Sequence, residues 1–233
     1  MTILDRLDSN LTLDETETMV LDSVSSMARG NLMDRAADLD RSGDFPWANV
    51  HAINALGLNT MFIPERYGGN PLSYSCYLAC VREISAACAA TGIVWATNFH
   101  GLKPIIDFGT QEQKERFLPV IAAGGLASLA ITESGAGSDA TAMTTLFREE
   151  GDDIVITGGK TFITNGDVAD IYLLFGKWEG IADPKKAISA LVLEKGTAGL
   201  SITGKEDKLG VRASSTASLA FEECRIPRTN LVG

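Results

Sequence analysis

The sequence predicts an α+β protein in which a helical half precedes a half built from strands. Apolar residues recur at helical spacing in the first half, as at Met19, Val20 and Val24. In the second half the pattern changes to short apolar runs separated by glycine, asparagine and proline. Because helices and strands are segregated along the chain, we expect an all-α domain over residues 1–125 and a β-barrel-like domain over residues 126–233.

The helical half contains start and stop signals for five helices. Residues 42–46 break the first helix, and Pro46 suits the first position of the second. Gly109 follows the expected end of the fourth helix, and the spacing of Thr110 and Gln113 predicts a capping box that opens the fifth. The expected helices cover residues 13–40, 47–56, 73–90, 91–108 and 111–123.

The second half contains signals for seven strands. The pair Gly158–Gly159 stands between two apolar runs, and it predicts a two-residue hairpin. Further turns are indicated at residues 165–166 and 183–184 and at Gly196. The expected strands cover residues 126–132, 154–157, 160–164, 171–178, 187–193, 200–203 and 216–222.

A glycine turn at residues 135–139 follows the first expected strand and matches the pattern G-x-G-x-x-A. In a dinucleotide-binding βαβ unit such glycines open a helix, and an acidic residue ends the next strand. Here the threonine-rich segment 141–145 follows the turn, and the acidic residues 152–153 precede the next strand. We therefore prefer a β-domain with flavin-sized loops at its strand ends over a nicotinamide site.

Composition and charge exclude several classes of protein. The formal net charge is −10 and no basic patch stands out, so nucleic acid is not an expected partner. No apolar run reaches roughly 18 residues, so no membrane span is expected. The N-terminus lacks the features of a secretion signal or a transit peptide, so we expect a bacterial cytoplasmic protein, with the mitochondrial matrix as the alternative.

The cysteines do not form a metal-binding pattern. Cys76 and Cys80 are four residues apart on an expected helix, but no second pair matches them and the chain has only two histidines. We expect buried thiols in a reducing compartment and no metal site.

Four motifs follow one another along the chain. They are IPERYGG at residues 63–69, FGTQEQKERFLP at 108–119, AITESGAGSD at 130–139, and KLGVRASST at 208–216 with FEECRIP at 221–227. Together they resemble the acyl-CoA dehydrogenase family, and the last is most similar to short-chain and branched-chain members. The resemblance implies a helical N-terminal domain, a middle β-domain and, in the family, a C-terminal four-helix bundle that is expected to be absent from this chain.

The resemblance also implies a reaction. Family members use FAD to dehydrogenate an acyl-CoA thioester to a trans-2-enoyl-CoA, pass the electrons to an electron-transfer flavoprotein, and form oligomers, so a homo- or hetero-oligomer is expected. Their usual base is a glutamate on the bundle, so the base is expected outside this chain. Glu83 and Glu133 are the carboxylates nearest the motifs, and we expect them to form salt bridges or caps.

Site residues follow from the same motifs. Thr132 is expected to offer its hydroxyl and backbone N–H to the polar edge of the flavin, and Arg212 either borders the CoA channel or pairs with a structural carboxylate. The implied cofactor-binding residues are Leu129, Ile131, Thr132, Gly137, Ser138, Phe162, Ile163 and Thr164. The implied substrate-binding residues are Ser138, Arg212, Ser215 and Thr216.

Two other functions remain open. An oxygen-using relative, such as an acyl-CoA oxidase or a nitroalkane oxidase, shares these motifs. A non-catalytic or half-site subunit that needs a partner chain fits the same sequence. The motifs do not indicate the length or branching of the acyl chain.

Overall fold

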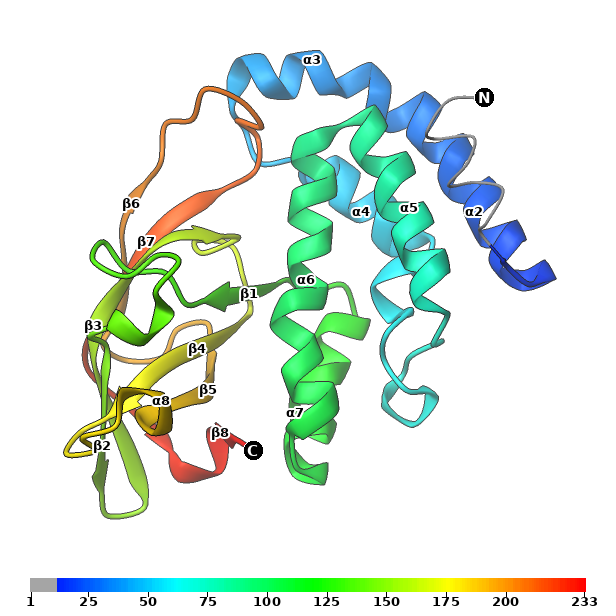
Figure 1. Ribbon diagram of the computed structural model, residues 1–233. Coiled ribbons are helices and arrows are strands. Elements are labelled where there is room, and N and C mark those ends of the chain that lie inside the picture. The colour runs from blue at the N-terminus through cyan, green and yellow to red at the C-terminus, as the bar shows by residue number, and fades with distance from the viewer. Residues whose placement is uncertain (1–11) are drawn as a thin grey trace.

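The computed structural model describes residues 12–233, and it places the helices of residues 15–122 on one side of a β-sheet (Figure 1). Helix α6 (Ala89–Phe108) lies between the preceding helices and the strands, where it packs against β1 (Ala127–Ala130). The predicted order of helices followed by strands is confirmed. The N-terminal segment considered above, residues 1–11, lies outside the described residues.

The helical half follows the predicted signals closely. The capping box of Thr110 and Gln113 is present at the start of α7. The expected first helix is one helical run whose middle turn, Ala28–Leu32, has π geometry. The boundary between α5 and α6 lies at Cys88, which has an extended backbone, slightly before the predicted position. The longer helices are α2 (Glu15–Met27), α3 (Met33–Ser42), α4 (Trp47–Ala55), α5 (Tyr74–Ala87), α6 and α7 (Gln111–Ala122).

The strands form one mixed sheet in the order β6-β7-β3-β2-β4-β5-β8, with β1 parallel to β4. In the described part of the chain β6 and β8 are the two ends of this path, so the sheet is open and barrel-like only in a loose sense. Besides β1, the strands are β2 (Leu146–Glu150), β3 (Asp153–Thr164), β4 (Ile171–Trp178), β5 (Ile188–Glu194), β6 (Leu200–Lys205), β7 (Thr216–Pro227) and β8 (Leu231–Val232).

The predicted hairpin at Gly158–Gly159 is wrong, because β3 runs through both glycines without turning. Gly158 has a φ of 147°, and a Cβ there would lie 2.7 Å from the Cα of Thr145. The pairing of β3 with β7 also shifts register between Ile156 and Gly158. The glycines therefore permit a bulge and a close backbone approach, which are the other common reasons for glycine inside a strand.

The helices and the sheet share a buried apolar layer. Leu102 of α6 and Phe117 of α7 belong to the same cluster as Leu173 of β4 and Val192 of β5. The proposed division between residues 125 and 126 falls in the connection between α7 and β1. The layer fixes the strand ends relative to the helices, and the candidate site lies at those ends.

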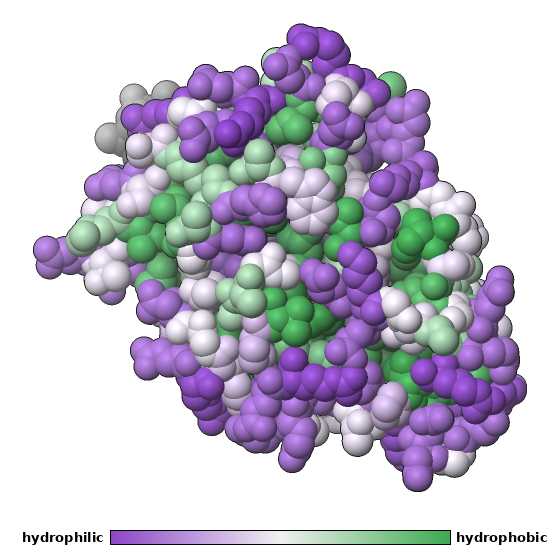
Figure 2. Space-filling model, turned by 180° about the vertical axis from the view of Figure 1, so that it is seen from behind, coloured by the Kyte–Doolittle hydropathy of each residue, from purple (hydrophilic) through white to green (hydrophobic). Residues whose placement is uncertain are grey.

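The surface of the helical half exposes several large apolar side chains, including Met19, Leu78 and Phe108. Figure 2 shows the molecule from behind, where apolar patches lie between hydrophilic ones. Exposed apolar patches of this kind are common where another chain or segment binds. Among residues 12–233, none of the helices has the length and apolarity needed to cross a bilayer.

Candidate functional site

The glycine turn belongs to a loop that leaves the sheet after β1 and returns as β2. Both strands pair with β4, β1 at Ala127–Ala130 and β2 at Leu146–Phe147. Within the loop, Glu133 and Ala136 exchange backbone hydrogen bonds of 3.0 and 3.1 Å that close the turn. Only a single 3-10 turn, Ala140–Ala142, follows. The helix that a nicotinamide site requires after its glycines is therefore not formed here.

Hydrogen bonds join the start of this loop to the end of β3. The backbone N–H of Thr161 donates to the carbonyl of Thr132 at 2.9 Å. The hydroxyl of Ser128 donates to the carbonyl of Thr164 at 2.7 Å. The structure thus brings together the two groups of predicted cofactor residues, at 129–132 and at 162–164.

Thr132 offers two polar groups at this edge. Its backbone N–H and its hydroxyl have no hydrogen-bond partner within the described part of the chain, although the residue is half-buried. Polar groups in folded proteins are normally paired, so unpaired donors at a half-buried edge indicate a place for a ligand. These are the two groups that the sequence motif assigns to the flavin.

Phe162 and Ile163 face opposite ways. Phe162 is 60% exposed, while Ile163 is 2% exposed and packs in the core of the sheet. Ile163 can therefore meet a ligand only through its backbone. Phe162 has a φ of 58°, which is rare for a bulky side chain, and it lies at a register shift between Lys160 and Ile163. Strained backbone of this kind is concentrated at functional sites.

The turn itself leaves open space. Gly137 and Ser138 are exposed, and a Cβ at Gly135 or Gly137 would meet no protein atom within 4 Å. Neither glycine has a positive φ, so the packing and backbone of the protein do not require glycine at these positions. A ligand that approaches the backbone closely would require glycine there, and the cofactor role of this loop stays a prediction.

A buried ion pair lies beneath the turn, and sequence reasoning assigned no role to one of its members. The Nζ of Lys160 donates to Oε1 of Glu133 at 2.7 Å, and the two side chains are 0% and 6% exposed. Burial raises the pKa of the Glu133 carboxyl, but hydrogen bonds from Lys160, Thr145 and Thr144 outweigh it and lower this pKa to about 2. Glu133 therefore forms the expected salt bridge and is fixed as a carboxylate.

The predicted substrate residues Arg212, Ser215 and Thr216 line one cavity of about 80 Å³ between the β6–β7 loop and residues 43–45. Ser138 is not among its lining residues. The hydroxyl of Ser215 donates to Asp167, and that of Thr216 accepts from Lys208 at 3.1 Å.

Arg212 contacts the helical half. Its Nη1 donates to the backbone carbonyls of Asp40 and Arg41 at 3.2 and 3.3 Å, at the C-terminal end of α3. A cation at a helix C-terminus is favourable, because unpaired carbonyls gather there. The guanidinium of Arg212 therefore binds backbone carbonyls, and the backbone N–H of the same residue donates to Oδ1 of Asp40 at 3.4 Å, so Arg212 has structural contacts of both kinds.

Asn165 is a further residue whose importance the sequence did not show. It is fully buried with a φ of 61°, and its Nδ2 donates to the carbonyl of Val94 in α6 at 3.0 Å and to that of Ala127 in β1 at 3.2 Å. The Asn-Gly pair at residues 165–166 indicated only a turn. The same asparagine also fixes the end of β3, next to Thr164.

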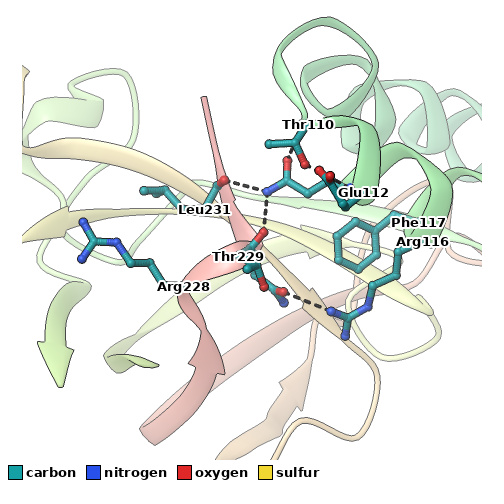
Figure 3. Close-up of a pocket in the computed structure, with 9 residues that line it drawn as sticks. Thr110, Glu112, Arg116, Phe117, Arg228, Thr229 and Leu231 are labelled. Carbon is teal, nitrogen blue, oxygen red and sulfur yellow. Dashed lines mark hydrogen bonds between the residues drawn. The ribbon is translucent and has the colours of Figure 1, made fainter. Parts of the chain in front are cut away.

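A separate pocket of about 300 Å³ lies at the N-terminus of α7 (Figure 3). Its polar groups bind one another: the Gln113 amide donates to the carbonyls of Thr229 and Leu231, both at 2.7 Å, and Arg116 donates to Asn230 at 3.3 Å. None of the predicted site residues lines it. The hydrogen bonds in this pocket therefore connect α7 to residues 229–231, and the pocket is not the candidate site.

Comparison with known proteins agrees with the motifs. Residues 14–125 match the model of the acyl-CoA dehydrogenase N-terminal domain, and residues 128–224 match that of the middle domain. A Mus musculus protein named short-chain specific acyl-CoA dehydrogenase, mitochondrial, is 42% identical over 223 residues, which cover 95% of this chain and 54% of that protein. This chain thus spans about half the length of that curated relative.

Two solved structures show the same fold. Butyryl-CoA dehydrogenase from Megasphaera elsdenii matches with a TM-score of 0.91 and 29% identity, over 96% of this chain and 60% of that chain. An acyl-CoA dehydrogenase from Bacillus anthracis, complexed with FAD, matches with a TM-score of 0.85 and 30% identity, over 95% of this chain and 38% of that chain. Since two family models together match most of its residues, the chain belongs to the acyl-CoA dehydrogenase family.

Proposed function

We propose that this chain supplies the flavin-binding part of an enzyme that dehydrogenates an acyl-CoA thioester to a trans-2-enoyl-CoA with FAD. The observation that carries the proposal is the edge formed by residues 129–132 and 162–164, where Thr132 has two unpaired donors beside an exposed aromatic residue. A relative of the same fold is complexed with FAD, which supports the choice of cofactor.

The residues at this edge fit a flavin. The N–H and hydroxyl of Thr132 are donors for the polar edge of the ring, where negative charge develops on reduction. Phe162 supplies an apolar surface, Leu129, Ile131, Ile163 and Thr164 complete the edge, and Gly137 and Ser138 allow the cofactor to approach the backbone. When bound, FAD supplies the hydride acceptor, and the protein positions it and excludes water.

The base is proposed to come from outside these residues. Glu133 is held in its ion pair with a pKa of about 2, and Glu83 accepts hydrogen bonds from Ser25 at 3.0 Å and from Arg82 at 3.1 Å. Neither is placed to take a proton from a substrate. A carboxylate on a further segment or on a partner chain is needed.

We propose Ser138, Ser215 and Thr216 as contacts for the pantetheine arm of the substrate. Arg212 joins them only if it gives up its bonds to the end of α3. A short acyl chain, an electron-transfer flavoprotein as electron acceptor, an oligomeric assembly and a bacterial cytoplasmic location complete the proposal. The similarity to the short-chain relative supports the short acyl chain. The resemblance of the motifs supports the electron acceptor and the oligomer, and the bacterial sources of the two matching structures support a bacterial location.

The experiment is a titration of the purified chain with FAD, in which the visible absorbance of the flavin measures binding. Binding that weakens when Thr132→Val removes the hydroxyl supports the proposal, and no binding at any concentration contradicts it. Butyryl-CoA is then added without oxygen. Bleaching by the chain alone contradicts both the half-site alternative and the proposal that the base lies outside these residues. Bleaching only after a base-bearing chain is added supports both. Rapid return of the oxidised spectrum in air favours an oxygen-using relative.

A further inference from the structure

The ammonium group of Lys160 holds one particular peptide group at the site edge. Its Nζ donates to the carbonyl oxygen of Ile131 at 2.9 Å, in addition to Oε1 of Glu133. The side chain of Lys160 is completely buried, so both bonds are made away from water. Charge-assisted hydrogen bonds in such surroundings are shorter and stronger than neutral ones.

The Ile131 carbonyl, bound by Lys160, determines the direction of the Thr132 N–H. The carbonyl of Ile131 and the N–H of Thr132 belong to the same planar trans peptide group, so they point in opposite directions. Because Lys160 binds the carbonyl on one side, the N–H is turned to the other side, where it has no partner among residues 12–233. The next carbonyl, that of Thr132, is fixed separately by Thr161.

Glu133 in turn fixes the lysine. Its Oε1 accepts from the N–H and the hydroxyl of Thr145 at 3.0 and 2.7 Å, and its Oε2 accepts from the same groups of Thr144 at 2.6 and 2.7 Å. With Lys160, the carboxylate therefore accepts five hydrogen bonds. It anchors the two ends of the glycine loop to each other and leaves the ammonium little freedom to move.

We propose that Lys160, anchored by Glu133, is a positioning residue that keeps the Thr132 N–H directed at the flavin edge. The inference rests on the proposed function for the identity of the ligand. A purely stabilising role is a weaker explanation, because replacing both members of a buried ion pair by apolar residues is often neutral or stabilising. Orientation of a peptide group is what the ion pair supplies and an apolar pair does not.

Two variants separate orientation from stability. Lys160→Met removes the ammonium and leaves Glu133 without its charge partner. The double variant Glu133→Leu with Lys160→Met replaces the whole pair by apolar side chains and is expected to recover most of the stability. Leu191→Ala is the matched control, because Leu191 belongs to the apolar cluster of the sheet that also contains Ile156, and it lies on β5, which pairs with β4 and β8.

Hydrogen exchange of the free chain tests whether Lys160 holds the edge next to the peptide group that it binds. The N–H of Thr161, which donates to Thr132, reports whether the edge is held, and the N–H of Ile156 in the same strand reports global opening. In both Lys160 variants we expect Thr161 to exchange about tenfold faster relative to Ile156, since one charged hydrogen bond is lost. Leu191→Ala is expected to accelerate both amides equally. An unchanged ratio in the Lys160 variants contradicts the inference.

FAD titration is the second measurement, and it separates the two proposals. The double variant is expected to bind FAD about tenfold more weakly than the native chain and to lower the reduction potential of the bound flavin, at nearly native stability. Native affinity and potential in the double variant overturn the inference while the proposed function stands. If the native chain binds no FAD, the proposed function fails, and the exchange ratio still decides whether Lys160 holds the edge.

Discussion

Gly158 packs directly on Thr145: a Cβ at Gly158 would lie 2.7 Å from the Thr145 Cα and 2.8 Å from its hydroxyl oxygen. Thr145 is completely buried, and both its N–H and its hydroxyl donate to Glu133. The close approach of β3 to the end of the glycine loop is therefore part of what supports the candidate site.

Gly158→Ala is expected to destabilise the chain by about 3 kcal/mol, because the new methyl group meets backbone and because alanine is strained at a φ of 147°. Urea unfolding at neutral pH measures the change. Gly204→Ala is the matched control in β6, where a Cβ meets nothing within 4 Å and φ is not positive. The control is expected to shift stability by less than about 1 kcal/mol. Equal losses in the two variants contradict this account of the bulge.

The glycines of β3 show which features of the fold could be predicted from the sequence and which could not. The apolar run that begins at Ile171 located β4 correctly, at residues 171–178. The apolar runs on either side of Gly158–Gly159 led to the wrong prediction of a hairpin, because a two-glycine turn and a glycine bulge look identical in sequence. The difference arises from Thr145, which is distant in sequence and packs against the glycine only in the folded chain.

Glu133→Gln is expected to reduce stability at neutral pH by about 3 kcal/mol, because it leaves the ammonium of Lys160 buried without a counter-charge. The substitution is also expected to make the free energy of unfolding less dependent on pH in the acid range. The folded-state pKa of Glu133 is about 2 and the unfolded value is 4.5, so its contribution is complete above the unfolded value and is lost as the pH falls through the folded value. Urea unfolding between neutral and acid pH measures both effects.

Glu150→Gln is the control for that experiment. Glu150 pairs with Arg225 and Arg148 on the surface, at 2.8 and 3.2 Å, and exposed ion pairs of this kind contribute little to stability. If Glu150→Gln and Glu133→Gln change the loss of stability at acid pH equally, the buried pair has no special role in that loss.

Asn165→Ala is expected to destabilise the chain by about 3 kcal/mol, because it removes the donors for the carbonyls of Val94 and Ala127 and places alanine at a φ of 61°. Asn165→Gly removes only the hydrogen bonds, so its loss is expected to be smaller. Asn70→Ala, at an exposed side chain, is the control. Thermal unfolding measures all three, and an equal loss in the glycine and alanine variants shows that the backbone conformation costs nothing.

Phe162→Asn is expected to raise the stability of the free chain by about 1 kcal/mol and to weaken FAD binding. Asparagine tolerates a φ of 58° better than phenylalanine, whereas the exposed ring offers an apolar surface to the flavin. Thermal unfolding and FAD titration measure the two effects. Phe108→Asn is the control for exposure, since Phe108 is 67% exposed at the end of α6. Unchanged FAD affinity in Phe162→Asn contradicts the role given to the ring.

The candidate site could be predicted in part. The motifs predicted both segments of the edge, because each segment is a continuous stretch of sequence. They did not show that Lys160 is buried and Phe162 exposed, since regular alternation puts residues 160, 162 and 164 on one face of a strand. The register shift between Lys160 and Ile163 breaks that alternation, and it depends on pairing with β7. The roles of Lys160 and Asn165 arise from contacts with distant segments, which spacing along the chain does not encode.

The central claim is that residues 129–132 and 162–164 form one flavin-binding edge. The most direct measurement is a titration of the isotopically labelled chain with FAD, followed by the chemical shifts of its backbone amides. We predict that the largest changes fall on Thr132, Phe162, Ile163 and Thr164 together, and that they saturate with one affinity. Saturating changes confined to other surfaces, or changes on only one of the two segments, would contradict it.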